Sequence, residues 1–223
     1  MDTIFRGDLS TRRGRALAWI DSLFIDHALI RLAWTNFAPV VPGGLYRCNH
    51  PTPGRLAAIV RRHRIRTLIN LRGRTASGSD ALSREAAARL GLDFIDAPLK
   101  SSAPPPRERI LHLLDTFATM REPALIHCKS GADRAGLASA IYLLAHGATV
   151  AQAARQLSLR HGHIAGAEAG ILGAFLQAYA REGEGRLPFR DWVATAYDPA
   201  ALRNAHNGNA ALRFLASRVL RRE

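Results

Sequence analysis

Short apolar segments alternate with longer amphipathic or alanine-rich segments along the middle of the chain. The short segments are rich in β-forming residues and predict strands at 45–48, 66–71, 94–97 and 124–127. The longer segments predict helices at 52–63, 82–90, 110–117, 134–145 and 167–181. Strands that alternate with helices favour parallel pairing, with the helices covering the sheet. We therefore expect an α/β fold with a largely parallel sheet of four to five strands.

Local signals place the start or end of several of these helices. Thr52 followed by Pro53 is typical of a helix start, with a hydroxyl at the N-cap and proline at the first helical position. Gly91 follows an alanine-rich stretch in the usual C′ role. Thr149 and Gln152 have the spacing of a capping box, which predicts one more helix after them.

The two ends of the chain are basic and amphipathic. Residues 12–35 predict a long, mostly apolar helix with three arginines at its start, and 210–220 combine arginines with large apolar residues. Such helices either pack on the domain or lie at a membrane surface. Charges inside 16–34 argue against a helix that spans the membrane. We expect an N-terminal helical extension over 1–39, a central domain over 40–185 and a basic C-terminal extension over 186–223.

Composition and charge narrow the possible partners. Of the 223 residues, 48% are hydrophobic and 22% charged, which is typical of a globular protein. Thirty-one Lys and Arg against 18 Asp and Glu give a net charge of +13, which attracts nucleic acid, acidic membranes or phosphorylated substrates. Aromatic–basic interleaving and zinc-finger spacing are absent from the sequence, so we expect no specific nucleic-acid partner. Two cysteines and no evident secretory signal favour the cytoplasm, with peripheral contact at the inner membrane face left open.

The residues most indicative of chemistry follow the strand expected at 124–127. They read His127-Cys128-Lys129-Ser130-Gly131-Ala132-Asp133-Arg134. A glycine-containing loop at a strand-to-helix junction can turn several backbone N–H groups inward and bind an anion. The same field favours the thiolate of Cys128, while the planar fork of Arg134 can hold two phosphate oxygens. No second Cys or His lies nearby at ligand spacing, so we expect no metal site.

This segment resembles the His-Cys-X5-Arg signature of protein tyrosine and dual-specificity phosphatases, above all the bacterial dual-specificity branch. The resemblance covers roughly 40–182 and implies a dual-specificity-like cysteine phosphatase fold. It also implies a two-step reaction without metal or cofactor, in which Cys128 forms a phosphocysteine that water then hydrolyses. Arg134 would bind the phosphate and stabilise the transition state. The residues expected to bind substrate are Lys129, Ser130, Gly131 and Ala132.

The general acid departs from the family's pattern. Relatives usually carry an aspartate in the loop before the helix that precedes the signature strand, where this chain has Ser101 and Ser102. Neither serine can protonate a leaving oxygen. Asp133, directly before Arg134, is our first candidate, because the myotubularin branch is proposed to use a loop aspartate. Asp96, 32 residues before Cys128, is the second candidate. The third alternative is a reaction without a dedicated acid.

Several functions remain open within and beyond this resemblance. The family's usual activity predicts a phosphatase of phosphotyrosine or dual-specificity type, with phosphorylated protein as the partner. Lys129 follows the nucleophile as in the phosphoinositide 3-phosphatase branch, which favours a membrane phospholipid or glycolipid phosphate as the alternative. Ala135 stands where many relatives have Ser or Thr, which predicts slow hydrolysis of the phosphoenzyme. With the displaced acid, it also keeps open a phosphate-binding pseudophosphatase.

Overall fold

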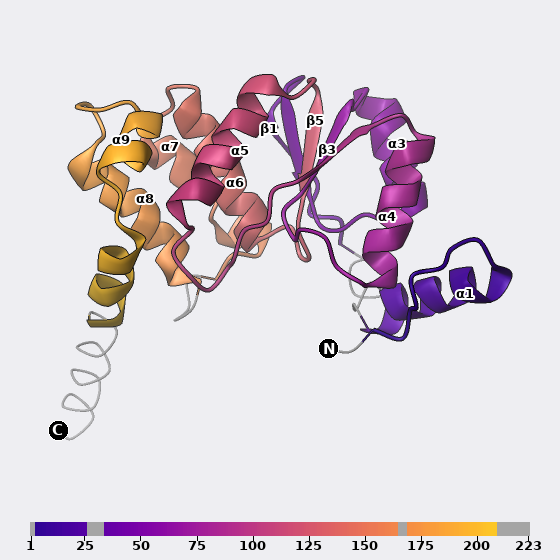
Figure 1. The fold of residues 1–223 in the computed structure, drawn as a ribbon. Coiled ribbons are helices and arrows are strands. Elements are labelled where there is room, and N and C mark those ends of the chain that lie inside the picture. The colour runs from indigo at the N-terminus through magenta and orange to yellow at the C-terminus, as the bar shows by residue number, and fades with distance from the viewer. Residues whose placement is uncertain (1–2, 26–33, 165–168, 209–223) are drawn as a thin grey trace.

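A five-stranded sheet forms the centre of the molecule (Figure 1). The structure, a computed structural model, describes residues 3–25, 34–164 and 169–208. The strands are β1 (Ala38–Val41), β2 (Leu45–Cys48), β3 (Thr67–Asn70), β4 (Asp93–Asp96) and β5 (Ala124–His127). Their spatial order is β1-β2-β5-β3-β4, with β1 antiparallel to β2 and all other pairs parallel. The predicted α/β fold with a largely parallel sheet is thus confirmed.

The four strands expected from the sequence are present within one residue of their predicted starts. The fifth, β1, was not predicted, because it is four residues long and contains Pro39. Proline cannot donate a ladder hydrogen bond, so within sheets it is confined to edge strands, strand starts or bulges. β1 is an edge strand, and its register with β2 shifts between Pro39 and Val41.

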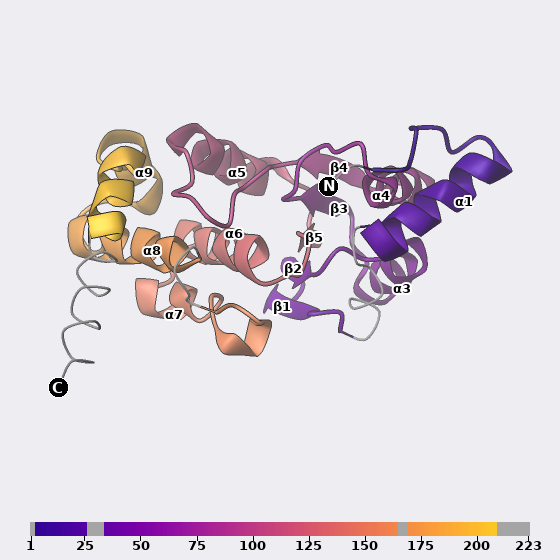
Figure 2. The same cartoon turned by 90° about the horizontal axis from the view of Figure 1, so that it is seen from below.

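Helices cover both faces of the sheet (Figure 2). One face carries α3 (Pro53–His63) and α4 (Gly78–Arg89), and the other carries α5 (Arg107–Thr119) and α6 (Asp133–Ala145). Strand residues alternate between the two layers, as the pleat requires. Leu68 and Leu125 are buried on the α3–α4 side, while Ile69 and Ile126 belong to the larger cluster on the α5–α6 side. Both layers are therefore filled from the same short strands.

The local helix signals predicted the starts of two helices. The Thr52 hydroxyl accepts a hydrogen bond from the N–H of Arg55 at the start of α3. Thr149 and Gln152 form the predicted capping box of α7 (Val150–Ala154). The start of α4 was predicted four residues too late, because Ser77 caps the helix through the N–H of Asp80 ahead of its apolar stretch. Here the capping side chain, rather than the apolar pattern, marks where the helix begins.

The N-terminal segment packs on α4 but differs from the single helix expected over 12–35. A regular helix, α1 (Arg12–Ile20), passes into a π-helical turn, η1 (Asp21–Ile25), while residues 34 and 35 are not helical. Asp21 is fully buried, because its carboxylate accepts hydrogen bonds from the Thr3 hydroxyl at 2.7 Å and from the N–H of Gly78 at 2.7 Å. The change of form begins at this inward carboxylate. Residues 26–33 lie outside the described part.

The described part of the C-terminal segment continues the main core. α8 (Gly170–Glu182) and α9 (Phe189–Thr195) pack through aromatic rings, and residues 199–208 are helical. Trp192 is fully buried, with its ring centroid 5.8 Å from that of Phe175 and 5.3 Å from that of Tyr179. The division expected at 185 and 186 stays a prediction, although the residues just beyond it share this core. The basic stretch 210–220 lies outside the described residues.

Candidate active site

The loop between β5 and α6 has the form that its sequence predicts. Cys128 directly follows the central strand, is 1% exposed, and its Sγ accepts a hydrogen bond of 3.2 Å from the N–H of Gly131. Gly131 has φ +75°, and a Cβ there would lie 2.7 Å from the backbone nitrogen of Asn49. Glycine is therefore required at this position on two grounds, backbone conformation and close approach. The sulfur lies at the base of the loop.

Hydrogen bonds from outside the loop hold four consecutive carbonyl groups of the loop. The donors lie on the segment before β1, on β2, and just after β2. The bonds run from His50 N to Lys129 O (3.2 Å), Asn36 Nδ2 to Ser130 O (3.1 Å), Arg47 Nη2 to Gly131 O (2.7 Å) and Arg47 Nη2 to Ala132 O (3.0 Å). A peptide's N–H and C=O point in opposite directions, so carbonyls held outward favour N–H groups on the inner side of the loop. The N–H of Gly131 meets the Cys128 sulfur, and that of Ala132 donates to the Ser130 hydroxyl oxygen at 3.4 Å. The result is a nest suited to an anion.

The first turn of α6 completes this nest. Asp133 is the first residue of α6 and Arg134, which is half-buried, is the second. Ala132 at the N-cap position has no polar side chain, so the first amides of α6 have no side-chain cap. These amides and the helix dipole favour an anion at this end. The arrangement thus suits a tetrahedral oxyanion beside Cys128.

The structure brings Asp133 together with a histidine that the sequence did not assign to it. Asp133 Oδ1 lies 2.7 Å from Nδ1 of His163, and His163 is 4% exposed. His163 follows η2 (Leu159–His161), a turn that is tied back to the loop because Asn36 Nδ2 also donates to the carbonyl of His161 at 2.8 Å. Burial, Arg47 and Arg160 lower the pKa of His161 to about 4. The Asp133 carboxylate and the His163 imidazole therefore adjoin the loop as a hydrogen-bonded pair.

Asp96, the second candidate acid, lies in a different environment. It ends β4, which is separated from β5 by β3, so it lies two strand spacings from the loop, about 10 Å. Both of its carboxylate oxygens accept hydrogen bonds from Arg84 Nη2, at 2.9 and 2.8 Å. Oδ1 also accepts one from Asn70 Nδ2 at 3.0 Å. The structure thus places Asp133 at the loop and Asp96 in a separate ion-paired network.

Lys129 lies at the rim of the loop beside a cavity of about 300 Å³. Arg72, from the loop after β3, lines the same cavity. Its opposite side is formed by residues of the N-terminal segment, which are Thr3, Asp21 and Ile25. Two cationic side chains from separate loops therefore border a space next to the expected phosphate site. Ser101 and Ser102, which stand where relatives usually carry the aspartate acid, lie in irregular structure before α5.

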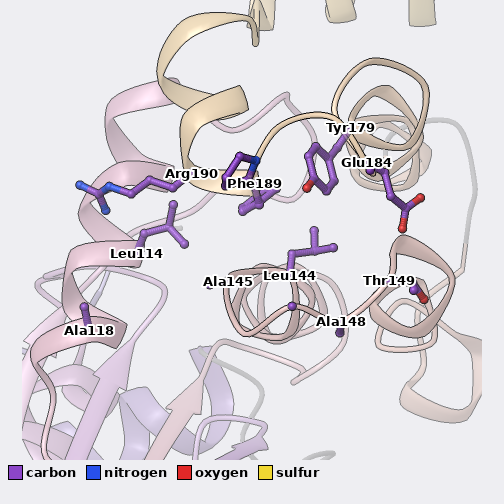
Figure 3. A pocket seen from close by; sticks show the side chains of 13 residues that line it. Leu114, Ala118, Leu144, Ala145, Ala148, Thr149, Tyr179, Glu184, Phe189 and Arg190 are labelled. Carbon is purple, nitrogen blue, oxygen red and sulfur yellow. The ribbon is translucent and has the colours of Figure 1, made fainter.

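A second cavity, of about 630 Å³, lies at the opposite end of α6 (Figure 3). Leu144 of α6, Leu114 of α5, and Tyr179, Phe189 and Arg190 line it. Because α6 has 13 residues, this end lies about 20 Å from the loop. Within the residues that the structure describes, no group of three or more His, Cys, Asp or Glu is arranged to hold a metal ion. The candidate chemistry is therefore concentrated at the start of α6.

Sequence reasoning missed three residues that shape the loop: Asn36, Arg47 and His163. Their contacts with the loop join positions 94, 84 and 30 residues apart. Arg47 carried one usable signal, since a charged residue within an otherwise apolar strand segment requires a buried partner. Asn36 carried none that a local pattern could reveal. His163 lies in a basic loop after a helix, which is a signal for a residue lining the cleft but not for its contact with Asp133.

Residues 35–169, more than half of the chain, match the family model described as "PTP-SAK: Swiss Army Knife protein, DSP-PTPase phosphatase domain". The chain belongs to this family of phosphatase domains. The matched region contains the whole sheet and the loop of Cys128. No curated protein sequence matches the chain.

Solved structures share the fold at low sequence identity. TpbA of P. aeruginosa is 20% identical, with a TM-score of 0.53 over 78% of this chain and 91% of TpbA. A putative phosphatase (DUF442) from Shewanella putrefaciens is 18% identical, with a TM-score of 0.54 over 69% and 95% of the two chains. The Siw14 catalytic core is 13% identical, with a TM-score of 0.52 over 78% and 92%. These likenesses confirm the dual-specificity-like cysteine-phosphatase fold.

Proposed function

We propose that this DSP-PTPase domain hydrolyses phosphomonoesters through a phosphocysteine intermediate formed on Cys128. The observation that carries the proposal is the loop geometry, in which four consecutive carbonyls are held outward and the Gly131 N–H meets the Cys128 sulfur. Such a nest stabilises the charge that develops on phosphoryl oxygens in the transition state. Membership in a phosphatase-domain family supports the same reaction class.

In the first step, the Cys128 thiolate attacks phosphorus in line with the ester bond. The S–P bond forms, the P–O ester bond breaks, and the leaving oxygen takes a proton from Asp133. The loop amides and the guanidinium of Arg134 bind the three equatorial oxygens throughout. We assign the acid to Asp133 because it lies in the loop itself and is bonded to His163, whereas Asp96 is tied to Arg84.

In the second step, water attacks the phosphocysteine. The Asp133 carboxylate takes a proton from the water, the new O–P bond forms, and the S–P bond breaks to return the thiolate and release inorganic phosphate. Many relatives assist this step with a hydroxyl at the position of Ala135. Ala135 is fully buried and offers no hydroxyl, so we expect the phosphoenzyme to accumulate. A rapid-quench experiment then shows a burst of released alcohol ahead of steady turnover.

For the substrate, we propose an aryl phosphate of the phosphotyrosine type. Cys128 is 1% exposed, so a phosphate must reach the base of the loop before sulfur and phosphorus meet. The long, rigid ring of phosphotyrosine reaches further than the short side chain of phosphoserine. Fold likeness does not choose the substrate, because TpbA has been solved with pTyr while Siw14 is described as a PP-IP phosphatase.

A second candidate substrate is a phospholipid or glycolipid phosphate, on account of the cations beside the loop. Lys129 and Arg72 border the cavity of about 300 Å³, where a second anionic group of the substrate would fit. Among the described residues, no helix combines the length and apolarity needed to cross a bilayer. A lipid substrate would therefore be met by peripheral contact.

Turnover of p-nitrophenyl phosphate tests the reaction itself. We expect Cys128→Ser to lower kcat by about 10⁴-fold or more, and Arg134→Lys to lower it by about 10²-fold, because a lysine cannot hold two oxygens. Cys48→Ser is the matched control, since burial raises the pKa of the Cys48 thiol above its ordinary value and disfavours a thiolate there. Inorganic phosphate binding without turnover by the unaltered protein would instead indicate a pseudophosphatase.

A substrate panel decides between the two substrate classes. We expect kcat/KM for phosphotyrosine peptides to exceed that for phosphoinositide and phosphorylated glycolipid vesicles by at least tenfold. The reverse order, together with sedimentation of the full chain with anionic vesicles, would overturn the phosphotyrosine assignment in favour of the lipid class.

A further inference from the structure

Arg47 is a fully buried arginine directly behind the catalytic loop. It lies on β2 and faces the same side of the sheet as Leu45, which belongs to the apolar cluster between the sheet and α5–α6. Its Nη2 donates to the carbonyls of Gly131 and Ala132, and its Nη1 donates to the carbonyl and side-chain oxygens of Gln156 at 2.8 and 2.9 Å. One guanidinium thus joins β2, the loop and the turn after α7.

Burial of this charge is costly, so the position calls for an explanation. Removal from water lowers the pKa of Arg47 to about 10, even though the nearby Cys128 and Asp133 oppose that shift. An apolar side chain would fill the same space without the cost of removing a charge from water. The guanidinium must therefore provide something that packing alone does not.

The surrounding residues leave room for this contact. A Cβ on Gly136, in the first part of α6, would lie 2.7 Å from the carbonyl oxygen of Gln156 and 3.4 Å from Arg47 Nη2. The helix, the turn after α7 and the guanidinium therefore meet closely because position 136 has no side chain. An arginine suits this place because its planar fork presents several N–H groups in fixed directions, whereas a lysine presents one compact charge.

We propose that Arg47 is a positioning residue for catalysis, which orients the amides of the phosphate-binding loop chiefly by holding the carbonyl of Gly131 outward. It also adds a donor to the carbonyl of Ala132, which accepts the N–H of Gly136 at 2.8 Å in the first turn of α6. The carbonyl of Gly131 shares a peptide with the N–H of Ala132, so rotation of that peptide would present an oxygen, rather than an N–H, to a phosphate. Arg47 makes no contact with substrate in this account, which rests on the proposed phosphatase function.

The test compares Arg47→Met and Arg47→Lys with Arg181→Met in the full chain. Arg181 is a matched control, because its side chain is 64% exposed on α8, away from the loop. We measure kcat and KM with p-nitrophenyl phosphate, and Ki for orthovanadate, well below each variant's melting temperature. Loss of a preorganised oxyanion donor lowers kcat by about 10²–10³-fold in enzymes, so we expect about 10²-fold for Arg47→Met and less for Arg47→Lys.

The vanadate constant separates positioning from a purely structural role. Vanadate copies the five-coordinate transition state, so misdirected amides raise its Ki in proportion to the loss of kcat/KM. Arg47→Met with Ki and kcat within twofold of the values for Arg181→Met would overturn the proposal. If Arg47→Met does not fold, Gln156→Leu removes one bond to Nη1 instead, and we expect a smaller change of the same two constants in the same direction; unchanged constants there would also overturn it.

Failure of the phosphatase assignment would give a different result. In that case the unaltered protein does not turn over p-nitrophenyl phosphate, whereas the effect of Arg47→Met on the binding of inorganic phosphate is still measurable by calorimetry. We expect a loss of affinity of at least tenfold in that measurement, and equal affinity would contradict the positioning role on its own.

Discussion

Two carboxylates near the same edge of the sheet differ in the partner that holds them. Asp96, at the end of β4, faces a guanidinium: Arg84 bonds both of its oxygens and also reaches Asp80 at 3.0 Å. Asp133, at the start of α6, faces an imidazole, with 2.7 Å between its Oδ1 and His163 Nδ1. A guanidinium stays protonated in proteins, whereas an imidazole gains and loses its proton near neutrality.

This difference supports our proposal that Asp133, rather than Asp96, is the general acid. The Arg84 guanidinium bonds both oxygens of Asp96 and lies 4.5 Å from the ring centroid of Phe94, so these contacts fix its place. Asp133 instead has the imidazole of His163 as its partner, at 2.7 Å. Asp96 became a candidate through its separation from Cys128, and Asp133 through its resemblance to the loop aspartate of the myotubularin branch. Their different partners favour Asp133.

The largest expected effect on kcat comes from Asp133→Asn. The amide keeps the shape of the carboxyl group but cannot supply a proton, so we expect kcat to fall by about 10²–10⁴-fold on alkyl phosphates, whose leaving groups need protonation. On p-nitrophenyl phosphate, which leaves as a stable anion, we expect a loss of less than about tenfold. The measurement is kcat for a series of phosphates that differ in leaving-group pKa. Equal losses across the series would sink the acid assignment.

A smaller effect on activity is expected for Asp96→Asn. The substitution removes one charge from a half-buried ion pair, so we expect the free energy of unfolding to fall by about 1–2 kcal/mol and kcat to stay within about threefold. Urea unfolding and the same substrate series measure the two quantities on one sample. A loss of kcat that grows with leaving-group pKa would transfer the acid role to Asp96.

The smallest effect is expected for the substitution of His161, which lies two residues before His163 in the sequence. The pKa of His161 is about 4 in the folded chain against 6.5 ordinarily, because burial and two arginines disfavour its charge. Between these values only the unfolded chain binds the proton, so the free energy of unfolding falls as pH is lowered through this window. We expect His161→Gln to reduce the fall in melting temperature from pH 7 to pH 4, compared with the unaltered chain.

The activity of the same variant provides the contrast. The pH dependence of kcat is expected to stay that of the unaltered protein, because His161 does not bond Asp133. A change in the acid limb of that profile, with the melting behaviour unaltered, would show that His161 rather than His163 takes part in proton transfer.

Local patterns predicted the strand-to-helix segment that carries Cys128. Apolar residues 124–127, a glycine in the loop and an alanine-rich helix after it are each recognisable within a short window, and together they define the β5–α6 junction. The parallel sheet followed from the same kind of pattern repeated along the chain. These features were predictable because each depends on residues close to it in sequence.

The features that the sequence did not predict depend on contacts between distant segments. The long helix expected at 12–35 changes form at Asp21, whose carboxylate bonds a helix start 57 residues away. Arg47 and Asn36 shape the loop from positions 84 and 94 residues before it. No periodicity or spacing rule encodes such pairings. Cys128 could therefore be proposed as the nucleophile from sequence, while the distant contacts that hold its loop required the structure.

The buried carboxylate of Asp21 has a practical consequence for anyone who shortens this protein. Within the part of the chain that the structure describes, Oδ1 of this carboxylate is bonded by Thr3 and Ile4, so trimming only four residues from the amino terminus would remove both of these donors and leave the bond from Gly78 to Oδ2. An unsatisfied buried polar group costs about 1–3 kcal/mol, and more when it is charged. Affinity tags and fusion partners are therefore better joined at the other terminus.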